Sequence, residues 1–451
     1  MIAAAHHISS STQAELSFFA FSTEVVSAAS IAAAFPSEPL VTWSSQDLTL
    51  AGVGIARELR GHGTQRWRQV IEAAQISTPH VVVDGAVASI HALGFACPRF
   101  IGGAAFAPGA ADRAPWQGFG DAWFVLPRWT YVSNGTRAMF VLAADASDLA
   151  NPARWQAELA RLRACREHGT TQAALVELQP AGAAEWHRQV TDITDAIARG
   201  ESSKIVAART LGVALAGSID AAALLAALDD RHADCVRVLV RPPNAGTLVA
   251  ATPERLVRRD GAAVSCDALA GTINTTVEDA RNKLLASTKD RREHDLVVQA
   301  IRAALEDAGA IVNDRACSGD ARDTPEVRAL RHVLHLHTPF HATLKEPRHV
   351  LELVARLHPT PAMGGTPTTS AIEWIQSHEP IARGWYSSPV GWFDLDGNGE
   401  FAVAIRSGVL AGNRAHLYAG AGIVAGSDPD RELAETDAKF RAMLGALGVA
   451  R

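Results

Sequence analysis

Two segments of the sequence carry pairs of acidic residues whose spacing could hold a metal ion. Asp290 and Glu293 lie three residues apart in STKDRREHDLVVQAI, and Glu432 and Glu435 have the same spacing in GSDPDRELAETDAKF. In a helix, residues at this spacing share one face. Four carboxylates in a dry site repel one another unless a cation holds them, and an all-oxygen set suits Mg²⁺, which takes further ligands from an anionic substrate. The pattern therefore predicts a magnesium site between two helices.

A purely structural role competes for part of this set. Asp290 and Glu432 fall in the first turn of their helices, where acids complement the helix dipole. Thr288 and Asp428 are the candidate N-caps. For these two acids taken alone, the structural role is the preferred interpretation. Glu293 differs, because apolar residues three, four, seven and eight positions later continue its stripe into the core. A buried carboxylate there needs a partner.

Basic and glycine residues near these acids could receive the substrate. Lys439 follows Glu435 by one helical turn, and Arg406 interrupts the otherwise apolar run FAVAIRSG. Gly420 and Gly422 in YAGAGIV lack side chains, so an oxyanion could approach their amide groups. Glycine at these positions could equally serve strand packing.

Lys204 and Glu254 are weaker candidates when judged by sequence alone. Lys204 opens the apolar run KIVAARTLGVAL, and Glu254 follows a proline in ATPERLV. Charged residues are common at strand ends, so neither position indicates catalysis without further support.

The elements that must position these residues follow from hydrophobic patterning. Period-two and apolar runs predict antiparallel strands, and period-3.6 stripes predict helices. The predicted strands are KIVAARTLGVAL, VRVLV, GTLVAAT, ERLVRRD and GAAVSC around an Asp260-Gly261 turn, GEFAVAIRSGVL, and AHLYAGAGIV. The predicted helices are 186–199, 289–305, 350–357 and 429–451. Upstream, a hairpin is predicted to turn at Asn134-Gly135 and a further helix to end at Gly169. The boundary between the two parts of the chain is predicted at 178–183. We expect large, mainly antiparallel sheets flanked by helices, with an N-terminal half (residues 1–180) and a catalytic half (residues 181–451).

Composition excludes several classes of function. The 451 residues carry 42 Lys+Arg and 48 Asp+Glu, a net charge of −6 that disfavours nucleic acid as a partner. No apolar stretch near the start reaches the roughly 20 residues of a membrane span, and the first residues do not resemble a secretory signal, so we expect no membrane partner and a cytoplasmic location. Five scattered cysteines lack a C-x-x-C pair, and the histidines at 332, 335, 337 and 341 lack a zinc motif, which favours ordinary strand and loop positions.

A resemblance to a known family raises the weaker candidates. The chain resembles the chorismate-utilising enzymes, which comprise isochorismate synthase, salicylate synthase, anthranilate synthase component I and aminodeoxychorismate synthase component I. The similarity covers about 186–444 and rests on SKIVAARTL, ATPERLV, ALAGTI, LLASTKDRREHDLVVQAI, HLHTPF, HPTPAMGGTP, VGWFDLDGNGEFAVAIRSGVL and YAGAGIVAGSDPDRELAETDAK. It implies an α/β fold of two large packed sheets with outer helices, like that of anthranilate synthase component I, and Mg²⁺-dependent chemistry on the ring of chorismate.

The resemblance also implies a role for each candidate. Lys204 resembles the base that activates water at ring C2, and Glu254 the acid that protonates the leaving C4 hydroxyl. A glutamate can act as an acid near neutral pH only if its pKa is raised. By position, Glu293 and Glu435 resemble the direct metal ligands, and Asp290 and Glu432 resemble the acids that hold metal-bound waters. The groups that resemble those binding the substrate carboxylates are Arg406, Lys439, Gly420 and Gly422. The residues that resemble those lining the ring are Gly271, Thr272 and His335.

Few residues separate the branches of this family. Ala270 stands where aminodeoxychorismate synthases carry a nucleophilic lysine, and no L-L-E-S motif of feedback-inhibited anthranilate synthases is present. Lys204 is tied by the resemblance to water rather than ammonia, so no glutaminase partner is expected. HPTPAMGG resembles isochorismate synthases more than salicylate synthases. We therefore expect an isochorismate synthase of menaquinone or siderophore biosynthesis, with salicylate synthase and then anthranilate synthase component I as alternatives.

Overall fold

The chain folds into two large sheets with helices outside them. A computed structural model describes residues 16–75, 80–83, 86–88, 94–180, 182–313, 325–331 and 333–449. Within these ranges, fourteen strands form a first sheet, sheet A, and ten strands form a second, sheet B. Neighbouring strands pair in the antiparallel sense, except that β1 and β5 are parallel. The predicted fold class is confirmed.

Sheet A contains strands from the whole length of the chain. In spatial order they are β11 Leu175–Pro180, β12 Lys204–Leu215, β24 Arg414–Val424, β23 Ser407–Ala411, β14 Thr247–Thr252, β13 Val236–Arg241, β2 Leu40–Ser44, β3 Thr49–Val53, β9 Trp129–Ser133, β10 Ala138–Ala144, β1 Ser17–Thr23, β5 His80–Val83 and β6 Ala86–Ala88, with β20 Gly365–Thr366 paired to β12.

Sheet B is likewise built from both halves. Its order is β17 Ala310–Val312, β19 Val333–Leu344, β16 Ala263–Asn274, β15 Arg255–Asp260, β22 Gly399–Val403, β21 Pro389–Asp394, β7 Arg99–Ala104, β8 Ala122–Leu126 and β4 Arg57–Gly61, with β18 Glu326–Ala329 paired to β19. Strands that precede residue 180 therefore share both sheets with strands that follow it.

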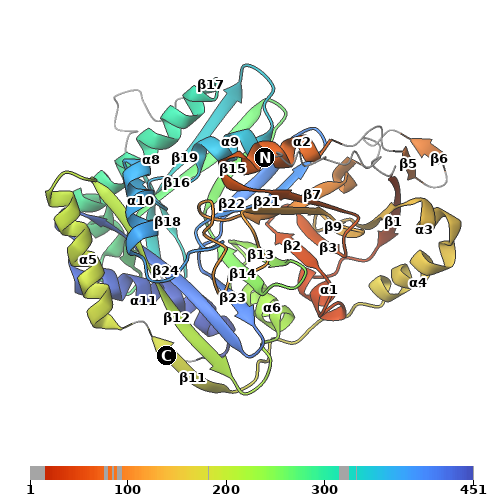
Figure 1. The fold of residues 1–451 in the computed structure, drawn as a ribbon, viewed down its shortest axis with the longest axis horizontal. Coiled ribbons are helices and arrows are strands. Elements are labelled where there is room, and N and C mark those ends of the chain that lie inside the picture. Colours follow the sequence, from red (N-terminus) through yellow and green to blue (C-terminus); the bar gives the residue numbers. More distant parts are fainter. Residues whose placement is uncertain are drawn as a thin grey trace, which may run out of the picture.

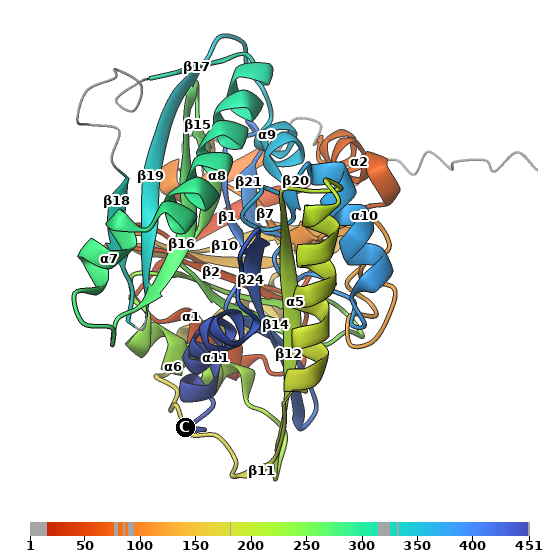
Figure 2. The same cartoon turned by 90° about the vertical axis from the view of Figure 1, so that its left-hand side faces the viewer.

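Helices cover the outer faces of the sheets (Figure 1). They are α1 Ala28–Ala34, α2 Arg66–Ala73, α3 Ala146–Ala150, α4 Pro152–Arg163, α5 Ala183–Ala198, α6 Ala221–Arg231, α7 Ala280–Ala286, α8 Thr288–Asp307, α9 Val350–Leu357, α10 Thr368–His378 and α11 Pro429–Ala446. Figure 2 shows α8 running along β16 and β19, and α11 beside β24. These are the two helices that carry the acid pairs.

Alternating residues of sheet A serve two cores. In β14, Leu248 faces the core shared with sheet B, whereas Val249 and Ala251 face a second core beneath the outer helices. This strand reads as a continuous apolar run because both of its faces are buried. Sheet A therefore lies between the two cores.

Most predicted elements are confirmed, with three corrections. The helix that follows residue 151 ends at Arg163, well before Gly169. The turn at Asn134 spans four residues, and only Gly135 of the pair has a positive φ, of 86°. The run GEFAVAIRSGVL is not one strand, because it divides into β22 of sheet B and β23 of sheet A.

Other expectations concern histidines, cysteines and membranes. His335, His337 and His341 lie in β19 as ordinary strand residues, while His332 and Cys317 fall outside the described residues. The four described cysteines are free thiols. Among the helices that the structure describes, none has the length and apolar character needed to cross a bilayer.

Candidate active site

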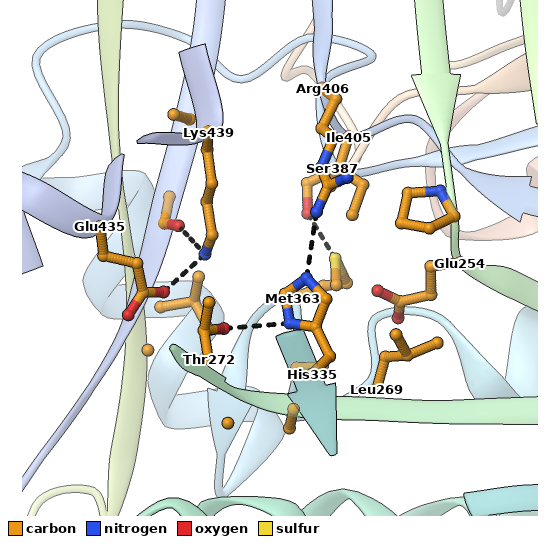
Figure 3. Close-up of a pocket in the computed structure, with 18 of the residues that line it drawn as sticks. Glu254, Leu269, Thr272, His335, Met363, Ser387, Ile405, Arg406, Glu435 and Lys439 are labelled. Carbon is orange, nitrogen blue, oxygen red and sulfur yellow. Dashed lines mark hydrogen bonds and ion pairs between the residues drawn. The ribbon is translucent and has the colours of Figure 1, made fainter. Parts of the chain in front are cut away.

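A cavity lies where strands of both sheets meet α8 and α11 (Figure 3). Its walls contain all of the predicted site residues except Lys204, Asp290 and Glu432. The predicted residues that line it are Glu254, Gly271, Thr272, Glu293, His335, Arg406, Gly420, Gly422, Glu435 and Lys439. Residues spread over 186 positions of sequence are therefore brought to one place.

Lys204 and Glu293 form a buried ion pair at one side of the cavity. Lys204 begins β12 with 0% of its side chain exposed, and its Nζ donates to Glu293 Oε1 at 2.8 Å. Burial raises the pKa of Glu293, but the charge and hydrogen bond of Lys204 outweigh burial, so that the pKa is lowered. Glu293 was expected to need a partner, and that partner is a lysine from β12. The buried residues of α8 itself are His294, Val297, Ile301 and Leu305.

Gly422 leaves the room that this ion pair occupies. A Cβ at this position would lie 2.5 Å from Glu293 Oε1 and 2.8 Å from Lys204 Cε. Both atoms lie at the ends of long side chains, so a side chain at position 422 would force the ion pair to shift. The glycine therefore leaves the pair free to take its present position.

Glu254 lies on the other side of the cavity, opposite Glu435 and Lys439 (Figure 3). It follows β14, is 4% exposed, and donates its backbone N–H to Thr252 Oγ1 at 3.2 Å. Burial, followed by the negative charge of Asp267, raises the pKa of Glu254 to about 8, although nearby cations oppose the shift. The raised pKa expected of an acid is confirmed.

Arg406 lies at the crossing from one sheet to the other. It connects β22 to β23 with a φ of 49°, which explains why the predicted single strand breaks here. Its Nη2 donates to His335 Nε2 at 3.0 Å, and His335 Nδ1 lies 3.1 Å from Thr272 Oγ1. Because a guanidinium can only donate, His335 must accept at Nε2. Burial and the charge of Arg406 lower the pKa of His335 well below its usual value, so the ring is neutral.

The amides of Gly420 and Gly422 face away from β12. Opposite them in the register, Val206 and Ala208 donate their N–H groups to the Gly364 carbonyl and to Glu379, on the other side of β12. In an antiparallel pair, residues that do not bond each other direct both of their polar groups outward. Beyond Tyr418, β23 no longer pairs with β24. The two glycine amides are therefore directed away from the ladder, on strand residues that line the cavity.

Lys439 borders the same part of the cavity. Its Nζ donates to the carbonyl of Gly420 at 2.7 Å and to Glu435 Oε1 at 2.7 Å. The two residues form an i,i+4 ion pair on α11, one helical turn apart as the sequence spacing indicated. A cation is thereby held beside the outward-facing glycine amides.

The outer acid of each helix also has a structural partner. Ser287, not Thr288, is the N-cap of α8, and its hydroxyl donates to the carboxylate of Asp290. Asp428 caps α11 as predicted. Glu432, whose side chain is 3% exposed, accepts from Lys289 Nζ at 2.7 Å.

The donor set fits a hard divalent cation. Asp290, Glu293, Glu432 and Glu435 offer only carboxylate oxygens, which Mg²⁺ prefers, and they lie where α8 and α11 approach the cavity. Lysines balance the charges of the three glutamates. In the described part of the chain, no three of these acids bring oxygens within 4.8 Å of one another. The residues are suited to a metal ion, and their side chains must move inward from the lysines to hold it.

Sequence reasoning missed several residues of the site. Tyr386 and Ser387 line the cavity, and the Ser387 hydroxyl donates to Met363 Sδ at 2.9 Å. Met363 lies within HPTPAMGG, so that motif pointed to the right loop without singling out the residue. Lys289 adjoins Asp290 in sequence, yet its contact with α11 depends on the packing of two helices. Nothing in the local sequence marks Tyr386.

Comparisons with known proteins agree with this geometry. Residues 4–448 match a family model described as chorismate binding enzyme. The chain is 38% identical to the salicylate biosynthesis isochorismate synthase of Pseudomonas aeruginosa, covering 91% of this chain and 85% of that one. It is 32% identical to the isochorismate synthase MenF of Bacillus subtilis, with coverages of 90% and 87%.

Solved structures show the same similarity. The menaquinone-specific isochorismate synthase MenF of Escherichia coli matches with a TM-score of 0.75 and 26% identity, covering 96% of this chain and 95% of that one. Anthranilate synthase component I of Streptococcus pneumoniae matches with a TM-score of 0.66 at 18% identity, covering 88% and 92%, which shows a shared fold.

Proposed function

The chain belongs to the chorismate-binding enzyme family, and we propose that it is an isochorismate synthase, an isomerase that converts chorismate reversibly to isochorismate with Mg²⁺. One observation carries this proposal beyond the family. A glutamate with a pKa of about 8 lines the cavity, and a buried lysine pairs with a second glutamate of its wall, which also supplies further carboxylates and cations.

Lys204 and Glu254 would divide the proton transfers between them. The Nζ of Lys204 would take a proton from the attacking water as the water oxygen bonds to ring C2. The ring double bonds shift, the C4–O bond breaks, and Glu254 gives its proton to the departing hydroxyl, which leaves as water. One water enters and one leaves, so the net reaction is an isomerisation. A carboxyl with a pKa of about 8 is still protonated at neutral pH, as this role requires.

Mg²⁺ would be held by Glu293 and Glu435, with Asp290 and Glu432 holding its waters. When bound, the ion would supply positive charge that neutralises a substrate carboxylate and fixes the position of the ring. Support for this assignment comes from the all-oxygen donor set on facing helices, and from Gly422, which keeps Glu293 clear of any side chain.

Cations and amides at the cavity wall would receive the carboxylates of the substrate. Arg406 is fixed by its hydrogen bond to His335, and Lys439 by the carbonyl of Gly420. The outward amides of Gly420 and Gly422 add two donors beside Lys439. Neutral His335, with Thr272 and Gly271, would border the ring without adding charge.

The branch is assigned by what the cavity lacks as well as by what it holds. Ala270 supplies no nucleophile, so the chemistry is left to water activated by Lys204, and no glutaminase partner is needed. The names of the relatives connect them with salicylate and with menaquinone synthesis, and the product of this chain could enter either route. Salicylate synthase is the runner-up, because it would use the same base and then eliminate pyruvate.

Chromatography of the products tests the proposal. The purified chain with chorismate and Mg²⁺ should yield isochorismate without appreciable pyruvate, and added ammonium should not change the product. Glu254→Gln protein, purified identically, controls for contaminating enzymes. Salicylate with stoichiometric pyruvate would assign the chain to the salicylate branch, and anthranilate in the presence of ammonium would overturn the role of Lys204.

A further inference from the structure

Lys289 is a cation of the site without a part in the proposed chemistry. It lies in the first turn of α8, and its Nζ reaches across to Glu432 Oε1 on α11 at 2.7 Å. Lys204 and Lys439 pair with the other two glutamates, but each of them has a proposed task at the substrate. Lys289 is 39% exposed on its side chain, whereas Glu432 is 3% exposed. The pair therefore joins a rim lysine to a buried acid.

The charge of Lys289 reaches the whole acid set. Glu432 is its hydrogen-bonded partner, and the charges of Glu293 and Glu435 also act on it. Glu293 in turn feels Lys289 as well as Lys204. The ammonium group of Lys289 thus lies among the carboxylates that are proposed to hold a divalent metal ion.

The positions of the acids fit this arrangement. Their oxygens are not gathered within coordination distance, as far as the described chain shows. Each glutamate is drawn to its own lysine instead. Glu432, buried and acidic, would be costly to keep without a counter-charge. Lys289 supplies that charge from a position where the side chain can swing into solvent.

We propose that Lys289 is an internal counter-cation, which neutralises Glu432 in the metal-free protein and must leave it when a divalent ion binds. The inference rests on the proposed metal site. It has two consequences: Lys289 stabilises the metal-free fold, and it weakens the affinity for divalent ions. The exchange is a competition between charges, so it applies to Mn²⁺ as well as to Mg²⁺.

Calorimetric titration with Mn²⁺, without substrate, tests the competition. Lys289→Met should bind Mn²⁺ about fivefold or more tightly than the unmodified chain, because one competing positive charge is removed. Lys289→Arg keeps the charge and should restore the original affinity. Lys283→Met, which removes an exposed lysine of α7, is the matched control and should change nothing.

Thermal unfolding gives a second readout. Without metal, Lys289→Met should melt about 1–3 °C lower than the unmodified chain, and saturating Mn²⁺ should remove the difference. Lys289→Gln is a second neutral variant, for use if the methionine variant does not fold. Equal or weaker Mn²⁺ binding in a folded neutral variant overturns the proposal for Lys289. If Glu293→Gln leaves Mn²⁺ binding unchanged in the otherwise unmodified chain, the metal site itself is wrong, which is a separate failure.

Discussion

Glu254 and Glu293 are two carboxylates that line one cavity, and their pKa values move in opposite directions. Burial raises the pKa of Glu254 to about 8, with Asp267 adding to the shift. Burial acts on Glu293 in the same direction, but Lys204 at 2.8 Å reverses the outcome. Nearby lysines, with Lys204 the strongest of them, thus lower the pKa of Glu293, whereas burial raises the pKa of Glu254. The cavity therefore contains one carboxyl group with a raised pKa and one carboxylate with a lowered pKa. Acid catalysis beside a metal ion requires both.

The largest effect is expected where the ionised carboxylate is removed. Glu293→Gln should abolish turnover and weaken Mg²⁺ binding by more than the ~10–100-fold typical of changes around a metal's direct ligands. The fold should be nearly intact, because glutamine keeps the shape and can still accept from Lys204. Calorimetry with Mg²⁺ and a turnover assay measure the two losses. Full activity in the presence of EDTA would contradict the proposal that turnover requires a metal ion.

The protonated carboxylate should behave differently under the same substitution. Glu254→Gln should lower kcat by about 10²–10⁴-fold, the range of general acid catalysis, while Mg²⁺ binding stays unchanged. Glu158→Gln, in α4 and outside the cavity, is the matched control. Equal loss of Mg²⁺ binding in Glu254→Gln and Glu293→Gln would contradict the assignment of Glu254 as the acid and Glu293 as a metal ligand.

A smaller effect is expected from pH, and its sign follows from the raised pKa. Because the protonated form of Glu254 is the active one, kcat/KM should fall as pH rises through about 8, by about tenfold per unit above it. Activity at pH 9.5 should therefore be well below that at pH 7.5. In Glu254→Gln this alkaline fall should disappear from the residual activity. An unchanged alkaline fall in that variant would assign the titration to another group.

Much of this site could be predicted because its signals are local. The i,i+3 spacing placed Glu293 and Glu435 on helix faces, and α8 and α11 begin within one residue of their predicted starts. The apolar run from Lys204 forms β12 with the predicted bounds. Short-range periodicity and family motifs carry this kind of information.

What could not be predicted depends on how distant segments pack. Arg406 looked like a strand residue, since it lies inside the run GEFAVAIRSGVL, but the chain leaves sheet B for sheet A at this position. The contact between Lys289 and Glu432 joins two helices 143 residues apart. The N-cap of α8 is Ser287 instead of the neighbouring Thr288, because the backbone conformation determines which residue begins the helix. None of these features has a period or a spacing in the sequence.

In the proposed reaction, water activated by Lys204 attacks C2 while Glu254 releases the C4 hydroxyl. The most direct test is turnover of chorismate in ¹⁸O-labelled water, with mass spectrometry of isochorismate isolated from the first few per cent of reaction. One ¹⁸O atom is expected in the new C2 hydroxyl and none elsewhere in the product. Isochorismate that carries no label would show that the hydroxyl moves within the substrate, and would contradict the paired roles of Lys204 and Glu254.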